Sequence, residues 1–210
     1  MSDVLEFRLV LRDVSPLIWR RVHVRPTMTL AEVHEVILVL MEWSDDFLHR
    51  FLLHGRTYRV WRPHAPEGQD ARSVTLADLQ LCAGEVVRYE YNLLVPWTVN
   101  LRLKTVLPER RGRTYPYLVA GQRAAPPEDL RGVGEYLERR HWHELHPPFH
   151  ALKDLATAVQ RRLAGEADTD NSALDEALER VSMYVQYTST QLNISKLRQA
   201  LLALPQEAQE

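Results

Sequence analysis

Cysteine is almost absent from this chain of 210 residues, which contains only Cys82. A single cysteine cannot form an internal disulfide, and without a second cysteine nearby it cannot belong to a zinc ribbon. Long apolar runs are also missing, because no stretch approaches the ~20 residues of a membrane-spanning helix. The first residues lack the basic and apolar segments of a secretion signal. These absences predict a cytoplasmic protein without disulfides and without a membrane partner.

The motifs of several enzyme classes are missing as well. There is no GxSxG for a serine hydrolase, and neither GxxxxGKS/T nor GxGxxG for binding phosphate groups. The run His143-Glu144-Leu145-His146 is one residue shorter than the zinc-binding HExxH motif, whose histidines share a helix face only when four positions apart. Pro147-Pro148 ends any helix there, so we interpret this run, with His141 and His150, as a solvated loop. We assign no catalytic residue, no metal ligand and no cofactor.

Arginine supplies most of the positive charge, and four Arg-Arg pairs occur, at 20–21, 110–111, 139–140 and 161–162. Arginine can bind phosphate through two parallel hydrogen bonds, so these pairs leave nucleic-acid binding open as a function. The formal net charge is −2, however, and acidic residues are interleaved with the arginines. This balance favours ordinary surface ion pairs over strong non-specific binding to nucleic acid.

Alternation of apolar and polar residues predicts a mostly antiparallel sheet. The predicted strands cover residues 4–12, 18–25, 48–53, 56–61, 85–91 and 97–105. The third and fourth form a hairpin about His54-Gly55. In the second strand Arg20 falls on the apolar face, where an unpaired charge would be costly. We therefore expect Arg20 to be bonded to a carboxylate or to backbone carbonyls.

Helix signals occur in two parts of the chain. Thr29 and Glu32 form a capping box at the start of a helix predicted over Thr29–Met41. Irregular chain is predicted for Pro108–Asp129, which is rich in arginine and proline. Beyond it, apolar stripes with helical spacing predict further helices, with a polar linker at Gly165–Asn171. The fold class is therefore α+β, with a domain over residues 1–135 and a helical C-terminal extension, 136–210, that packs on or beside it.

A series of motifs follows in a specific order along the first two thirds of the chain. These are Pro16, Trp19-Arg20, Thr29-Leu30, His34, Ile37, Trp43, Leu48-His49, Phe51, Tyr89, Tyr91, Trp97 and the run 121–129, with Gly132 and Tyr136 beyond. The series resembles the Orf-three-like family, named after an open reading frame on a root-inducing (Ri) plasmid. Members also occur as accessory passengers of insertion elements. The resemblance implies an α+β fold and a link to plasmid or mobile-element machinery, without an established reaction.

The chain departs from the family pattern between the last two predicted strands. The family has Tyr-x-Tyr-Asp-Phe-Gly-Asp-x-Trp-x-His, but Asn92, Leu94, Val95 and Val99 replace its aspartates, glycine and histidine here. A further histidine of the family is replaced by Phe47. Aspartate and histidine side chains close together can hold a metal or transfer a proton. The resemblance therefore implies that any polar site of the family has been lost from this chain.

These substitutions leave an apolar tip, Leu93–Val95, on the predicted hairpin. Such a tip is unusual in water, so either the C-terminal helices cover it or another protein does. The second alternative makes Leu93, Leu94 and Val95 a partner-binding site, and the leading hypothesis is a non-catalytic adaptor that binds another protein. We interpret the remaining motif residues as structural, namely Trp19, Arg20, His34, Trp43, His49, Trp97, Glu128 and Asp129.

Two alternative functions stay open. The first is a nucleic-acid-binding accessory protein that contacts DNA through Arg110, Arg111 and Arg113. The second is a residual enzyme of unknown reaction. Its site would combine Arg20, His34, His49, Glu128 and Asp129. These side chains converge only if the Pro-Pro-Glu-Asp segment folds back over the first helix.

Overall fold

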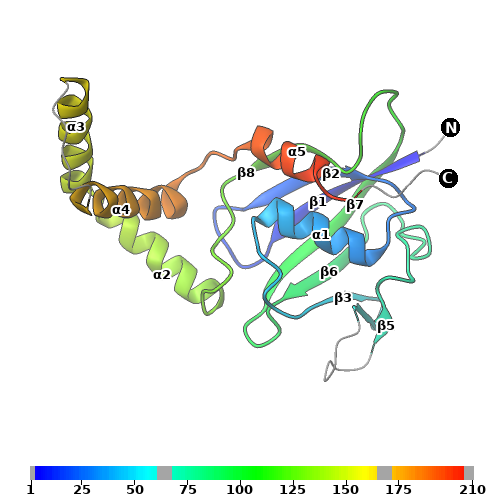
Figure 1. Cartoon of the computed structure of the whole chain (residues 1–210). Helices are drawn as coiled ribbons and strands as arrows, with labels where there is room; N and C mark the ends of the chain where they lie inside the picture. Colours follow the sequence, from blue (N-terminus) through cyan, green and yellow to red (C-terminus); the bar gives the residue numbers. More distant parts are fainter. Residues whose placement is uncertain (1–2, 61–67, 165–171, 206–210) are drawn as a thin grey trace. The chain divides into compact units, whose positions relative to one another are not determined.

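The computed structural model of the protein describes residues 3–60, 68–164 and 172–205. The chain forms two compact units (Figure 1). The first, which we call the sheet unit, comprises Met1–Val133 and Gln191–Glu210, and the second, the helical unit, comprises Gly134–Thr190. The last helix therefore belongs to the sheet unit, which differs from the expected division into residues 1–135 and 136–210.

Eight strands form a single sheet in the order β5-β4-β3-β6-β7-β1-β2-β8. Neighbouring strands are antiparallel, apart from the parallel pair β4 and β5. The strands are β1 (Asp3–Leu11), β2 (Trp19–Val24), β3 (His49–Leu53), β4 (Arg56–Arg59), β5 (Gln69–Asp70), β6 (Val86–Tyr91), β7 (Trp97–Pro108) and β8 (Tyr117–Gln122). This architecture confirms the α+β class and the mostly antiparallel sheet.

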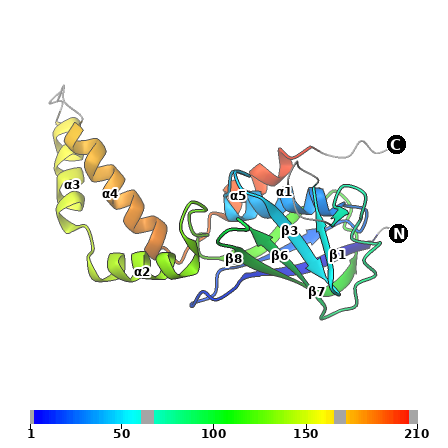
Figure 2. The same cartoon turned by 90° about the horizontal axis from the view of Figure 1, so that it is seen from below.

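Helix α1 (Leu30–Met41) lies over one face of the sheet, as does α5 (Ile194–Leu202) (Figure 2). Helix α1 begins with the predicted capping box: Glu32 N donates to Thr29 Oγ1 at 3.2 Å, and Thr29 N donates to Glu32 Oε2 at 2.6 Å. The amphipathic helix buries its apolar stripe in the core between the helices and the sheet. That stripe comprises Leu30, Val33, Val36, Ile37, Leu40 and Met41.

The structure corrects the prediction of irregular chain over Pro108–Asp129, because β8 forms within this segment and pairs with the edge of β2. Leu118 of β8 lies opposite Val22 and is buried. The other side chains of β8 are half-buried or exposed. A strand with one buried side chain shows too little alternation to stand out from the arginines and prolines around it.

Helix α5 completes the sheet unit. Asn193 caps its start by accepting a hydrogen bond from Lys196 N at 3.0 Å. Leu197 is buried, and Arg198 Nε donates to the carbonyl of Leu118 in β8 at 2.8 Å. The apolar stripe of α5 therefore belongs to the core of the sheet unit and not to an extension.

The helical unit contains all but the first two residues of α2 (Gly132–Leu145), together with α3 (Phe149–Leu163) and α4 (Ser172–Thr188), of which α3 and α4 pack against each other. Helix α2 ends before Pro147-Pro148, as predicted. The predicted linker Gly165–Asn171 lies outside the described residues, as does Trp61 at the end of the predicted strand 56–61. None of the helices in the described ranges combines the length and the apolar character that crossing a membrane requires.

Candidate functional site

Two histidines meet between α1 and the sheet. His34 lies one residue after Val33 of the apolar stripe of α1, and His49 is the first residue of β3. Both side chains are buried, and their rings stack with centroids 3.4 Å apart and an angle of 17° between the ring planes. Two positive charges in this position would repel each other.

Asp45 joins the two histidines from the connection between α1 and β3. Its Oδ1 lies 2.9 Å from His34 Nε2. One potential ligand atom from each of His34, Asp45 and His49 lies within 4.8 Å of the other two. We call these three residues the His–Asp cluster. The cluster lies at other positions than those at which the family's aspartates and histidines are replaced in this chain.

Tyr89 of β6 supports the cluster from the sheet. Its hydroxyl lies 2.8 Å from His34 Nδ1, and its ring is fully buried. Burial raises the pKa of Tyr89 well above its ordinary value, and the nearby acidic groups raise it further. The phenol therefore keeps its proton at neutral pH. With Nδ1 bonded to the phenol, His34 directs Nε2 towards Asp45.

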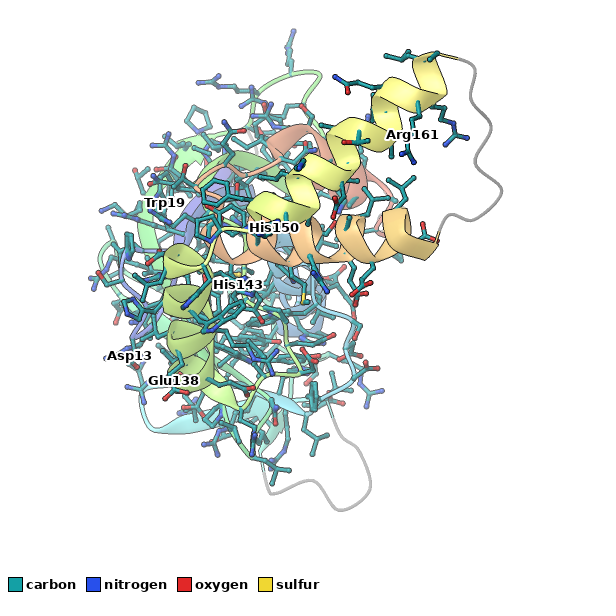
Figure 3. The ribbon with its side chains drawn as sticks, turned by 90° about the vertical axis from the view of Figure 1, so that its left-hand side faces the viewer. Asp13, Trp19, Glu138, His143, His150 and Arg161 are labelled. Carbon is teal, nitrogen blue, oxygen red and sulfur yellow. The ribbon has the colours of Figure 1, made fainter. Side chains whose placement is uncertain are left out.

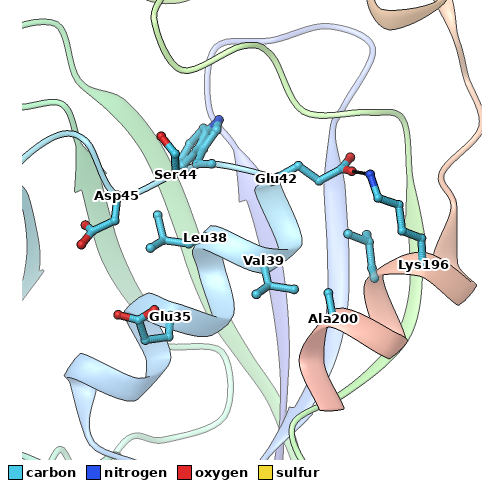
Figure 4. Close-up of a pocket in the computed structure, with 10 residues that line it drawn as sticks. Glu35, Leu38, Val39, Glu42, Ser44, Asp45, Lys196 and Ala200 are labelled. Carbon is cyan, nitrogen blue, oxygen red and sulfur yellow. Dashed lines mark hydrogen bonds and ion pairs between the residues drawn. The ribbon is translucent and has the colours of Figure 1, made fainter. Parts of the chain in front are cut away.

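A pocket of about 380 Å³ in the sheet unit reaches the cluster at Asp45. In Figure 4 the carboxyl groups of Asp45 and Glu35 lie at one end and the ion pair of Glu42 with Lys196 at the other. Burial raises the pKa of Glu35, and the charge of Asp45 raises it further. The Asp45 end of the pocket therefore carries a negative field that favours a cation.

The segment that contains Glu128 folds back over the end of α1. Glu128 accepts hydrogen bonds from Tyr91 Oη at 2.6 Å, from Ser44 N at 2.9 Å and from Ser44 Oγ.

Two tryptophans hold the backbone of the same segment. Trp97 Nε1 donates to the Glu128 carbonyl at 3.3 Å, and Trp43 Nε1 donates to the Pro126 carbonyl at 3.0 Å. These bonds fix the backbone beside Asp45 and give Glu128, Trp43 and Trp97 a structural role.

Arg20 is fully buried and bonded to backbone carbonyls, as expected. Its Nε donates to Leu40 O at 2.9 Å, and its Nη1 donates to Trp19 O and Gln122 O at 2.9 and 3.0 Å. Burial lowers the pKa of Arg20 to about 10, so the guanidinium stays charged at neutral pH. Its hydrogen bonds join the end of α1 to β2 and β8.

The five residues of the hypothetical residual enzyme therefore do not form one group. His34 and His49 are stacked, whereas Arg20 is bonded to Leu40, Trp19 and Gln122. Glu128 is held by Ser44 and Tyr91, and Asp129 is exposed. The residue that completes the cluster is Asp45, which was not among the residues predicted for a site. The available signal for this role was that Asp45 lies shortly before His49, the first residue of β3.

The apolar tip Leu93–Val95 connects β6 to β7. Leu93 is half-buried, Leu94 is 94% exposed and Val95 is 37% exposed. Asn92 begins the turn with φ 59°, a left-handed conformation that asparagine tolerates, and its carbonyl accepts from Val95 N at 3.1 Å. An ideal Cβ on Gly132 would lie 2.7 Å from Val95, so only glycine fits there. The binding role of the tip stays a prediction.

The three arginines proposed to contact nucleic acid lie between β7 and β8. Arg110 and Arg111 are exposed, and Arg113 stacks over Tyr117 at 4.2 Å from the ring centroid. The neighbouring Glu109 pairs with Arg25 at 2.9 Å. Nucleic-acid binding through these residues stays a prediction.

The histidines 141–150 lie in the helical unit, and the interpretation as a loop is corrected because α2 extends to Leu145. Figure 3 labels His143 on α2 and His150 near the start of α3. His143 stacks on Tyr187 with centroids 4.9 Å apart, and His146 Nδ1 donates to Trp142 O at 2.8 Å. Burial, and secondly the charge of Arg139, lowers the pKa of His143.

The helical unit also presents an apolar surface that sequence reasoning did not anticipate. Its stripes have the predicted helical spacing, but many of their side chains remain exposed. The exposed apolar residues of α3 and α4 are Phe149, Leu152, Val159, Leu163, Leu178, Met183 and Val185. Periodicity identifies such a stripe but does not identify the surface that covers it.

The fold and its cluster define an α+β protein with a single sheet, one face of which carries α1 and a buried His–Asp group. The chain belongs to the plasmid pRiA4b ORF-3-like protein family, whose model matches residues 3–151. It is 27% identical over 140 residues to the uncharacterized protein y4hQ of Sinorhizobium fredii (strain NBRC 101917 / NGR234), covering 66% of this chain and 72% of that protein. These matches confirm the family resemblance.

A solved structure shares the fold. The crystal structure of MM3350, a protein of unknown function from Methanosarcina mazei Go1, is similar with a TM-score of 0.65 and 28% sequence identity. The similarity covers 71% of this chain and 86% of that protein.

Proposed function

We propose that the protein is a non-catalytic interaction protein that assembles by pairing its helical unit with that of a second copy. The observation that carries this proposal is the exposure of the apolar stripes of α3 and α4. Val159 and Leu163 of α3 are 56% and 84% exposed, and Val185 of α4 is 51% exposed. Large exposed apolar patches mark surfaces that bind another molecule.

The helical unit has too small a core to be stable alone. The buried apolar side chains among its described residues are Tyr136, Ala151, Ala177 and Tyr187. Burying a large apolar side chain contributes about 1.5–3 kcal/mol, whereas fixing the backbone of one residue costs about 1–2 kcal/mol. Three helices with this core need additional apolar surface to bury against.

The charges of the two helices are complementary within one chain, where α3 packs against α4, and pairing with a second copy would repeat this match. Helix α3 ends in Arg161 and Arg162, whereas α4 begins with Asp175, Glu176 and, one turn later, Glu179. A two-fold axis repeats the same contacts on both copies, so it can bring the basic α3 of one copy against the acidic α4 of the other. Two helix pairs joined in this way form a four-helix bundle with one apolar core.

The test measures the mass of the full-length chain in solution by light scattering coupled to gel filtration. The wild-type chain is expected to be a dimer, and the double variant Val159→Glu/Leu163→Glu a monomer, because two charges would be buried without partners. Gln160→Glu is the matched control, since it adds a charge to an exposed position on the same helix and leaves the apolar stripe intact.

A wild-type chain that stays monomeric at all accessible concentrations would contradict the proposal, whatever the variants do. A double variant that remains dimeric with its helices folded would contradict it as well. If the wild type is monomeric, chemical cross-links between α3 and the sheet unit of the same chain would identify the sheet unit as the surface that covers the stripes.

The apolar tip supports a second contact, with another protein, in the same proposal. Tyr91 and Trp97 anchor the two ends of the tip in the core, and Leu94 projects from it with 94% of its surface exposed. A turn that is anchored at both ends and presents one leucine suits a small apolar pocket on another protein.

A further inference from the structure

We propose that His34, Asp45 and His49 bind one divalent transition-metal ion, for which Zn²⁺ is the representative. Imidazole nitrogen and carboxylate oxygen are ordinary zinc ligands, and three protein ligands with one open position are typical of zinc sites that also bind water or a small anion. The site lies entirely in the sheet unit. It is therefore independent of the pairing of helical units.

The geometry of the cluster is close to that of a metal site. A tetrahedral ion with bonds of about 2.1 Å holds its ligand atoms about 3.4 Å apart. Here the three ligand atoms lie within 4.8 Å of one another, and the pair from His34 and Asp45 is 2.9 Å apart. For both ring nitrogens to bind the same ion, the two stacked rings must turn apart, because the lone pair of each nitrogen lies in the plane of its ring.

The surroundings orient the ligands in the way that metal sites require. A ligand histidine usually bonds its second ring nitrogen to a fixed polar group, which sets the tautomer and the direction of the ring. The Tyr89 hydroxyl, 2.8 Å from Nδ1, has this position relative to His34. Burial of both imidazoles excludes competing water.

An ion can reach the cluster through the pocket. The Asp45 side chain is 32% exposed, in contrast to 3% for His34, and it lines the pocket together with Glu35. The neighbouring carboxyl of Glu35 adds negative charge when ionised, which attracts a divalent cation. An open coordination position would face this side, so a water molecule or a small anion is the expected fourth ligand.

The cluster does not use the positions at which the chain departs from its family. Asn92, Leu94, Val95 and Val99 lie in the β6–β7 connection and in β7, and Phe47 lies in the α1–β3 connection, whereas the cluster uses His34, Asp45 and His49. The loss of acid and imidazole groups from those positions therefore leaves this set of ligands complete.

The test titrates the metal-free full-length chain with Zn²⁺ by isothermal calorimetry, and with Co²⁺ by visible absorption, which reports coordination geometry. One equivalent of each metal is expected to bind. Asp45→Asn, which keeps size and the tolerance for a left-handed backbone, should lower the zinc affinity at least about tenfold. His49→Gln should lower it further, with circular dichroism showing whether the fold is retained.

Two controls separate this site from adventitious binding. Glu85→Gln removes the carboxylate of an exposed pair with His54, whose atoms lie 2.9 Å apart and to which the described residues add no third ligand, and should leave affinity unchanged. His143→Gln, in the helical unit, should also leave it unchanged. The proposal is overturned if the wild type shows no saturable binding, or if Asp45→Asn binds as tightly as the wild type. Binding that is lost in His143→Gln would instead assign the metal to the helical unit.

Discussion

The sheet unit and the helical unit are built from the same kind of amphipathic segment, but only the sheet unit buries its apolar faces. Leu9 of β1 is 1% exposed, whereas Leu163 of α3 is 84% exposed. The sheet unit brings together distant segments, since β1 pairs with β7 and α5 packs on β8. The helical unit is one continuous stretch of chain. Helical spacing is thus a property of each segment, and burial depends on what the fold places opposite it.

The two units also differ in how their helices begin. Helix α1 has a complete capping box, whereas α3 starts at Pro148 without a side-chain cap. Local sequence therefore stabilises α1 before any packing, and α3 depends more on what packs against it. The comparison leads to four predictions, in order of decreasing effect.

The largest effect is expected from the same substitution made in both units. Leu9→Ala should lower the free energy of unfolding by about 2–5 kcal/mol, because it leaves a cavity in a packed core. Leu163→Ala should change it by less than about 0.5 kcal/mol when it is measured at a chain concentration low enough to dissociate the proposed dimer. Urea denaturation followed by circular dichroism measures both. Equal losses would show that the stripe of α3 is buried within the monomer.

The capping box of α1 provides a smaller test. Thr29→Ala removes the acceptor of the Glu32 N hydrogen bond and should cost about 1 kcal/mol of stability. Thr29→Ser keeps the hydroxyl and should cost far less, which makes it the matched control. Thermal melting of the two variants gives the difference. Identical melting temperatures would mean that packing alone determines where α1 begins.

Sequence reasoning predicted the parts of the fold that local pattern determines. The strands with strong alternation and the capped helix α1 appear within a few residues of their predicted ends. Strand β8 was not predicted, because Leu118 is its one buried side chain and the segment therefore shows little alternation. Asp45 was missed as a cluster member because it belongs to a connection whose left-handed backbone, φ 68°, directs it to His34. Pattern shows which residues need covering, and only the three-dimensional arrangement shows what covers them.

The apolar tip tests whether an exposed apolar side chain of the sheet unit also binds a partner, as proposed for the helical unit. Leu94→Asp should change the melting temperature little, because 94% of the side chain already lies in water. The same variant should lose a partner that wild-type chain captures from its host, while Val106→Asp, at another exposed apolar position, should keep it. A variant that unfolds would show that the tip belongs to the core.

The smallest effect concerns the basic segment between β7 and β8, the part of the sheet unit proposed to contact DNA. Arg113 is engaged with the Tyr117 ring, so the exposed Arg110 and Arg111 are the main candidates for phosphate contacts. Two contacts give a slope of about −1.8 for the logarithm of the binding constant against the logarithm of salt concentration. Gel shifts over a salt series should show weak binding with this slope, and Arg110→Gln/Arg111→Gln should abolish it. A steeper slope, or a slope that the double variant leaves unchanged, would show that DNA contacts other residues. The next residues to test would be Arg161 and Arg162, which are adjacent in α3 of the helical unit.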